Sequence, residues 1–163
     1  MAEEQKEVQE EQLVVFEVAN EICGVDISTV QEIIRIQPIT EVPKAPEFVE
    51  GIINLRGKVI PVIDLRERFG FEKTEETKST RIVVVEVGDD TVGMIVDAVT
   101  EVLRLPTSAI EPPSPVVENV DSEYLRGIGK VDERLIILLD LEKILSEMEK
   151  GHLKQVKETT EVK

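Results

Sequence analysis

Short apolar runs rich in Val and Ile alternate with Asn, Asp, Gly and Pro along residues 12–150. Runs of this length, bounded by turn-forming residues, are typical of β-strands. The clearest pair is 51–55 and 59–65, which flank the tripeptide Arg56-Gly57-Lys58. This pattern predicts a β-hairpin with a tight turn at Gly57 and an exposed Arg and Lys at its tip.

A second pattern is an internal repeat. Residues 12–24 (QLVVFEVANEICG) align without a gap on 81–93 (RIVVVEVGDDTVG), and the register continues from 25–36 onto 94–105. After a Pro-rich connector in each half, the offset between equivalent residues changes from 69 to 76, so that VIPVIDL at 59 matches LIILLDL at 135. The equivalent residues include Gly24 and Gly93, Val30 and Val99, Glu32 and Glu101, Arg35 and Arg104, and Gly51 and Gly127. Chance alignment of Val/Ile runs explains similar composition but not this ordered repetition, which favours duplication.

Each repeat predicts a strand, a tight turn, a second strand, a short turn-like or helical piece, a Pro-rich loop and a second hairpin. Roughly five short strands per repeat leave open edges unless the sheet closes, so a small barrel is expected from each copy. Leu141, Ile144, Leu145 and Met148 have helical spacing and predict a short C-terminal helix. We therefore expect a mainly β protein of two five-stranded β-barrels related by internal duplication. The expected segments are a mobile acidic tail at 1–11, the first barrel at 12–70, a linker at 71–80, the second barrel with the helix at 81–150, and a mobile tail at 151–163.

The charge of the chain excludes several classes of partner. Thirty-four acidic residues against nineteen basic ones give a net charge of −15. Such a charge repels phosphate backbones and anionic membrane surfaces, so nucleic acid is not an expected partner. No apolar run approaches the roughly 20 residues of a membrane helix, and the N-terminus has no signal-peptide core. A cytoplasmic protein without direct membrane insertion is expected.

Few residues offer catalytic or metal-binding chemistry. The chain has one cysteine, Cys23, and one histidine, His152, so an internal disulfide and a Cys/His metal site are excluded. Cys23 lies in a predicted strand and is expected to be a core residue, and His152 lies in the C-terminal tail. The sequence has no Gly-rich phosphate loop and no nucleophile paired with a histidine. We expect a protein that is not an enzyme and uses no cofactor.

Candidate binding residues lie in the segment VQEII. Its spacing predicts one helical turn with Val30 and Ile33 on the same side, repeated by Val99 and Val102 in the second half. These four residues either belong to the core or form two apolar ridges that face each other in a groove between the barrels. Glu32 and Arg56 have opposite charges and are expected to form an ion pair that holds the hairpin tip against VQEII.

Three segments resemble the CheW adaptors of bacterial chemotaxis. They are GVDISTVQEI, the stretch PEFVEGIINLRGKVIPVIDLRERF, and VGMIVDAVTEVLRL, and the resemblance covers about residues 13–148. The signature NLRG-x-VIPVxDL is shared with the CheW-like regulatory domain of the CheA kinase and with CheW modules fused to receiver domains. A length of 163 residues leaves no room for a kinase or receiver domain, so the free adaptor is expected.

The resemblance implies SH3-like barrels and a scaffold without catalysis. Such a scaffold couples the cytoplasmic tip of methyl-accepting chemoreceptors to the regulatory domain of the histidine kinase CheA, in receptor arrays beneath the inner face of the membrane. The alternative is a small-ligand-binding or regulatory β-barrel module of another signalling system.

The motif matches and the predicted groove assign candidate residues to two surfaces. The candidate receptor-binding residues are Val30, Glu32, Ile33, Gly51, Val99 and Val102. The candidate kinase-binding residues are Ile39, Val42, Arg56, Gly57 and Lys58. The second repeat has Asp132-Glu133-Arg134 at the corresponding hairpin tip, which suggests that the two barrels have different partners.

Overall fold

The structure is a computed structural model that describes residues 9–44, 49–72, 74–112 and 124–144. The described part of the chain is mainly β, with the two helical segments α1 (Leu65–Arg68) and α2 (Leu141–Ile144) and the 3-10 turns η1 (Ile27–Thr29) and η2 (Thr107–Ala109). The strands of the first repeat are β1 (Glu10–Val18), β2 (Glu21–Asp26), β3 (Val30–Arg35), β4 (Val49–Leu55) and β5 (Lys58–Asp64). The strands of the second repeat are β6 (Arg81–Val87), β7 (Asp90–Val96), β8 (Ala98–Pro106), β9 (Ile110–Glu111), β10 (Leu125–Val131) and β11 (Arg134–Leu139).

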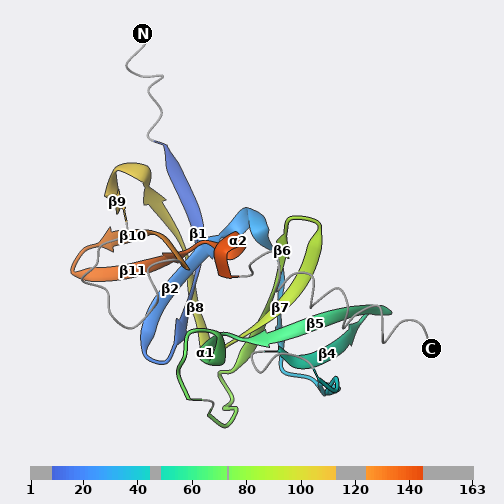
Figure 1. The fold of residues 1–163 in the computed structure, drawn as a ribbon. Coiled ribbons are helices and arrows are strands. Elements are labelled where there is room, and N and C mark those ends of the chain that lie inside the picture. The colour runs from blue at the N-terminus through green and yellow to red at the C-terminus, as the bar shows by residue number, and fades with distance from the viewer. Residues whose placement is uncertain (1–8, 45–48, 73, 113–123, 145–163) are drawn as a thin grey trace.

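The strands form two sheets. Sheet A has the order β8-β1-β2-β11-β10-β9 and sheet B has the order β3-β6-β7-β5-β4. Figure 1 shows sheet A on the left and sheet B on the right, with α1 and α2 between them. Neighbouring strands are antiparallel except for β2 with β11 and β5 with β7. The predicted hairpin is present as β4 and β5, and the predicted mainly β class with two SH3-like units is confirmed. Sheet B has the five strands predicted for each unit, whereas sheet A has six because it includes the short strand β9.

The repeats exchange their first hairpins. The β1–β2 hairpin of the first repeat lies in sheet A with strands of the second, and the β6–β7 hairpin lies in sheet B with strands of the first. The prediction that residues 12–70 and 81–150 each form a barrel of their own is therefore wrong for these hairpins. The repeat pattern shows that two copies are alike, but it does not show which copy a strand pairs with.

The pairing registers confirm the duplication. In the parallel pairs, Val62 lies opposite Gly93 and its equivalent Leu138 lies opposite Gly24. The antiparallel edge pairs follow the same rule, since Ile33 lies opposite Val83 as Val102 lies opposite Val14. The two halves therefore use the same registers.

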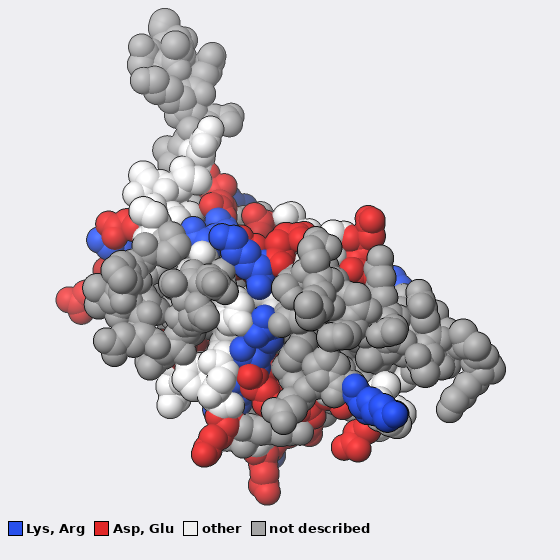
Figure 2. Space-filling model, viewed as in Figure 1, with Lys and Arg blue, Asp and Glu red and all other residues white. Residues whose placement is uncertain are grey.

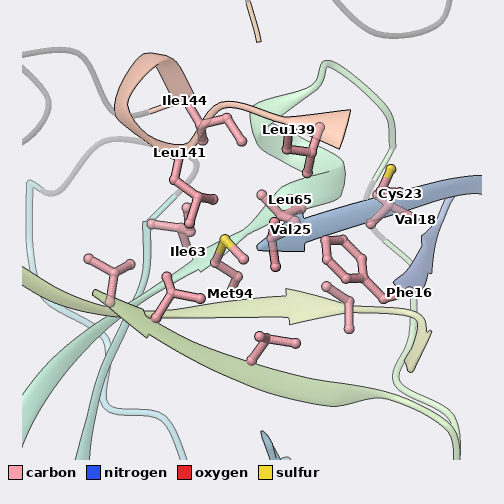
Figure 3. Close-up of a cluster of buried hydrophobic side chains, with 14 of the residues drawn as sticks. Phe16, Val18, Cys23, Val25, Ile63, Leu65, Met94, Leu139, Leu141 and Ile144 are labelled. Atoms are coloured by element: carbon pink, nitrogen blue, oxygen red, sulfur yellow. The ribbon is translucent and has the colours of Figure 1, made fainter. Parts of the chain in front are cut away.

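Strand alternation builds three apolar clusters. In β1, Leu13 and Val15 face a cluster inside sheet A, whereas Val14, Phe16 and Val18 face a larger cluster between the two sheets. Strand β6 does the same for sheet B, which explains why both strands are almost continuous apolar runs. Figure 3 shows the cluster between the sheets, here called the junction cluster. Its members include Phe16, Val18, Cys23, Val25, Ile63, Leu65, Met94, Leu139, Leu141 and Ile144.

The ends of the chain are described in part. Strand β1 begins at Glu10, so the last residues of the predicted N-terminal tail belong to sheet A. Helix α2 buries Leu141 and Ile144, as the spacing predicts. The rest of that predicted helix and the predicted tails at 1–8 and 151–163 lie outside the described residues. Among the described helices, none has the length and apolar character needed to span a membrane.

Candidate functional site

Strands β3 and β8 carry the candidate apolar residues and occupy equivalent edges of the two sheets. Each has an irregularity at the same place, after Val30 in β3 and after Val99 in β8, where one extra residue forms a β-bulge. The predicted helical turn at VQEII is therefore wrong, because these residues pair with β6 in extended conformation. A spacing of three between apolar residues on one face fits a helix, but it also arises in a strand with one bulged residue, because the bulge returns the third residue to the same face.

The strand conformation separates the four apolar candidates into two kinds. Val30 and Val99 are half-buried and pack against the junction cluster. Ile33 and Val102 lie on the same face, because their direct partners Val83 and Val14 also belong to that cluster, but they are 40% and 55% exposed. Of the two alternatives, membership of the core therefore applies to Val30 and Val99. Of these four residues, Ile33 and Val102 offer the larger apolar surface to a partner.

Glu32 and Arg56 form the predicted ion pair. The Arg56 Nη1 and Nη2 atoms donate to the two Glu32 carboxylate oxygens at 2.5 and 2.7 Å, which joins the β4–β5 turn to β3. The hydrogen bond from Arg56 holds the pKa of Glu32 below its usual value, against the opposing effect of partial desolvation. The same hydrogen bond raises the pKa of Arg56.

Sheet A contains a counterpart that the sequence analysis missed. Arg134 Nη1 donates to Glu101 Oε2 at 2.8 Å, and the hydrogen bond raises the pKa of Arg134. Glu101 is the equivalent of Glu32, whereas Arg134 aligns with Lys58 and not with Arg56. The equivalence of Glu32 and Glu101 was the signal in the sequence. The second ion pair was missed because its arginine is not at the position that aligns with Arg56.

The β4–β5 tip is a rigid and basic turn. Arg56 and Gly57 have φ values of 54° and 85°, as expected for a type I′ turn, so the predicted role of Gly57 is confirmed. Asn54 Oδ1 accepts the Gly57 N–H at 2.7 Å, and Lys58 Nζ lies 3.3 Å from Thr91 Oγ1. The guanidinium of Arg56 remains largely exposed, with 74% of its side-chain surface accessible.

Gly51 supports the connector between β3 and β4. Thr40 and Ile52 exchange two backbone hydrogen bonds of 2.9 Å beside Gly51. Gly51 is buried at φ 151°, and a Cβ atom there would lie 2.1 Å from the Thr40 carbonyl oxygen. The connector residues Ile39 and Val42 are both half-buried, and Ile39 packs against the cluster inside sheet B. Gly51 therefore positions this connector and offers no side-chain surface of its own.

One polar contact joins the two sheets beside the junction cluster. Figure 2 shows Lys and Arg side chains gathered between the sheets, near α1 and α2, on a surface with many acidic groups. Arg66 of α1 donates to both carboxylate oxygens of Asp97, at 2.9 Å from Nε and 2.7 Å from Nη2. Asp97 also accepts the Ala19 N–H of the β1–β2 turn at 2.8 Å. A helix of the first repeat, a turn in sheet A and the β7–β8 link therefore meet at one carboxylate.

Three other carboxylates could be considered as metal ligands. Glu50, Asp64 and Glu67 place oxygens within 4.8 Å of one another. Asp64 accepts the Arg66 backbone N–H at the start of α1, and each of the three acids has a further interaction partner. The cluster is thus explained as part of the structure around α1.

Comparison with known proteins identifies the family. The CheW-like domain matches residues 12–149. The chain belongs to the CheW-like family. The chemotaxis protein CheW of Klebsiella aerogenes is 37% identical over 139 residues, which cover 85% of this chain and 84% of that protein. The CheW of Thermotoga maritima is 37% identical over 136 residues, covering 82% and 86% of the two chains.

A solved structure supports the same assignment. The crystal structure of the scaffolding protein TtCheW from Thermoanaerobacter tengcongensis matches with a TM-score of 0.80 and 44% identity. The match covers 86% of this chain and 96% of that one. This CheW-like chain is therefore a chemotaxis scaffold, and a barrel module of another signalling system is not favoured.

Proposed function

We propose that this chain is a non-catalytic adaptor that joins the cytoplasmic tip of a chemoreceptor to the regulatory domain of the histidine kinase CheA. The cytoplasmic receptor arrays beneath the membrane are its proposed location. The family assignment supports the scaffold role, and the two partners follow from the resemblance of the NLRG-x-VIPVxDL region.

The observation that carries the receptor contact is the pair of exposed apolar side chains, Ile33 and Val102. They stand at equivalent positions on edge strands of different sheets, each next to a Glu held by an Arg. Exposed apolar side chains backed by a rigid edge suit an apolar anchor from a helical tip. The proposed receptor-binding set is Val30, Glu32, Ile33, Gly51, Val99 and Val102. Ile33 and Val102 make the contact in this proposal, and the other four position them.

The proposed kinase-binding surface is the β4–β5 tip with its connector. It comprises Ile39, Val42, Arg56, Gly57 and Lys58. The tip is held by the Asn54 contact and by the Glu32 ion pair, so little conformational freedom is lost on binding. Its two exposed bases contrast with the acidic residues Asp132 and Glu133 in the other tip, which supports a different partner for each end.

The test compares substitutions of the exposed residues Ile33 and Val102 with substitutions of the half-buried residues Val30 and Val99. Ile33→Asp and Val102→Asp should lower the melting temperature only slightly, because Ile33 is partly exposed and Val102 is more than half exposed. Each should weaken binding of a receptor cytoplasmic fragment, because burying one such anchor stabilises by about 1.5 to 3 kcal/mol. Binding of the CheA regulatory domain should be unchanged, with both affinities measured by calorimetry.

Val30→Asp and Val99→Asp are the matched controls. Both place a charge against the junction cluster and should lower stability before they affect any partner. Normal receptor binding by folded Ile33→Asp and Val102→Asp proteins would refute the proposed contact. An equal loss of receptor and kinase binding would refute the division of surfaces.

A further inference from the structure

The described strands pass from one sheet to the other at two equivalent places. Strand β2 of sheet A leads through η1 into β3 of sheet B, and β7 of sheet B leads through Asp97 into β8 of sheet A. Ser28 of η1 is the equivalent of Asp97. Each passage ends at the start of an edge strand that carries a proposed receptor contact, Ile33 in β3 and Val102 in β8. The separation of the two contacts therefore depends on how one sheet stands relative to the other.

Two hydrogen bonds fix Asp97 to sheet A. Its backbone N–H donates to the Glu17 carbonyl of β1 at 2.9 Å. Its carboxylate accepts the Ala19 N–H of the β1–β2 turn at 2.8 Å. By themselves, these two bonds join Asp97 to sheet A alone.

Arg66 supplies the contact with the other sheet. It lies in α1, which directly follows β5 of sheet B and stands between the two sheets in Figure 1. Its Nε and Nη2 atoms donate to the two Asp97 carboxylate oxygens at 2.9 and 2.7 Å. A planar guanidinium with two bonds to one carboxylate fixes direction as well as distance. The Arg66 and Asp97 side chains are 21% and 31% exposed, so the pair is partly shielded from solvent.

The pair adds a direction to a junction built largely from apolar side chains. Residues from both sheets, such as Phe16 and Met94, meet in the junction cluster. Apolar burial holds the sheets together, but it is not directional. The equivalents of Asp97 and Arg66 in the other half are Ser28 and Glu142, which cannot form an arginine–carboxylate pair. The duplication therefore does not repeat this contact.

We propose that Arg66 is a positioning residue for receptor binding, because by holding Asp97 it fixes the separation of Ile33 and Val102 and lets one receptor tip engage both. The inference rests on the proposed adaptor function. A contact at two points is stronger when its spacing is set in advance, since less conformational freedom is lost on binding. The proposed kinase surface lies on β4–β5 and its connector, in one sheet, so kinase binding does not depend on this spacing.

Two variants break the pair in the full chain. Arg66→Met removes the guanidinium and keeps an apolar stem, whereas Asp97→Asn keeps the size of the side chain and an acceptor for the Ala19 N–H. Arg126→Met is the matched control, because Arg126 forms a bidentate ion pair with Glu11 within sheet A, at side-chain exposures of 30% and 22%.

Spin labels at Arg35→Cys and Arg104→Cys report the relative position of the sheets. These are equivalent, exposed positions on β3 and β8, and Cys23 is buried. The distance distribution between the labels should be narrow in the otherwise unchanged chain and broader in both pair-breaking variants. The matched control should leave it narrow. A distribution that stays unchanged in both pair-breaking variants would overturn the inference.

Receptor binding is measured with a receptor cytoplasmic fragment that contains the tip. Both pair-breaking variants should bind it at least about fivefold more weakly, a factor that corresponds to about 1 kcal/mol. Affinity for the CheA regulatory domain should be unchanged, and so should both affinities of the matched control. Unchanged receptor affinity in both pair-breaking variants would overturn the inference.

A combined variant separates positioning from direct contact. Once Val102→Asp has removed one anchor, Arg66→Met should weaken receptor binding no further, because a contact at one point does not depend on spacing. Additive losses would indicate that Arg66 touches the receptor itself, which would overturn the inference. If Arg66→Met does not fold, Asp97→Asn decides in the same combination. Failure of the unsubstituted chain to bind the fragment would refute the proposed function, and this inference with it, whatever the label distances show.

Discussion

At the scale of single residues, the same interaction recurs in both halves from different sequences. Glu32 and Glu101 stand at equivalent positions, yet the first is held by Arg56 and the second by Arg134, which aligns with Lys58. An Arg side chain is long enough to reach the edge strand from either position in the turn. Contact between the hairpin tip and the edge strand is therefore retained even though the tips differ in charge.

The Glu32–Arg56 pair predicts a measurable titration. Because the hydrogen bond from Arg56 lowers the pKa of Glu32, Arg56→Ala should raise that pKa toward the ordinary value of 4.5. A lowered pKa in the folded state means that the stabilisation is present above about pH 4.5 and is lost as the pH falls through the folded-state pKa. Carboxyl-detected NMR of wild type and Arg56→Ala measures the shift. Lys58→Ala, at the same tip but next to Thr91, should leave it in place, and an unshifted Glu32 in Arg56→Ala would contradict the pairing.

The buried thiol of Cys23 is expected to be unreactive in the folded protein. Burial, with a smaller effect from the charge of Glu21, raises the pKa of its thiol from 9.0 to about 12. The thiol should stay protonated and unreactive toward iodoacetamide at pH 8 until denaturant unfolds the chain. Because the folded-state pKa is raised, this contribution to stability is complete below pH 9.0 and is lost as the pH rises through about 12. Rapid labelling of the folded protein would show that the residue is accessible.

At the scale of elements, turn chemistry was predicted more reliably than the conformation of the edge strands. The Arg56-Gly57-Lys58 hairpin followed from the need for positive φ at a tight turn, and the structure confirms it. The VQEII segment was misread because a bulge at Gln31 alters the spacing of its apolar residues, and a bulge has no signature in one sequence. Residue spacing therefore placed Val30 and Ile33 correctly on one face, but it assigned them to a helical turn when they lie in a bulged strand.

The close contact between Gly51 and the connector that precedes β4 predicts a loss of stability when a side chain is added. Gly51→Ala should cost about 2 to 3 kcal/mol, because it combines a strained backbone with a clash against the Thr40 carbonyl. Gly57→Ala is the matched control, since its φ is also positive but no atom lies within 4 Å of the added methyl group. It should cost about 1 kcal/mol. Urea unfolding measures both, and equal losses would show that the contact with the connector is not what constrains Gly51.

At the scale of the whole molecule, the halves are interleaved. Strand β6 pairs with β3 and β7 with β5, while β1 pairs with β8 and β2 with β11. The mainly β class could be predicted from the sequence. The repeat could also be predicted, from the equivalence of Gly24 and Gly93 and from the Asp-Leu dipeptide that ends both VIPVIDL and LIILLDL. The exchange was not visible, because a hairpin docked on its own copy and one docked on the other copy would satisfy the same registers.

The exchange predicts how the chain responds to being cut. Separate fragments 1–75 and 76–163 should each fail to fold. The first leaves β3 without a paired strand and takes one neighbour each from β1, β2 and β5, and the second does the same to β8 and to β6, β7 and β11. Each fragment would also expose its half of the junction cluster, to which both repeats contribute. Mixed in equal amounts, the fragments should recover the β-sheet signal and dispersed amide resonances in a concentration-dependent way, because the missing strands are then supplied between chains. The intact protein nicked after residue 75 is the control, and it should remain assembled at micromolar concentration. Cooperative unfolding of fragment 1–75 by itself would contradict the exchange, because a barrel built from one repeat would not need the other half of the chain.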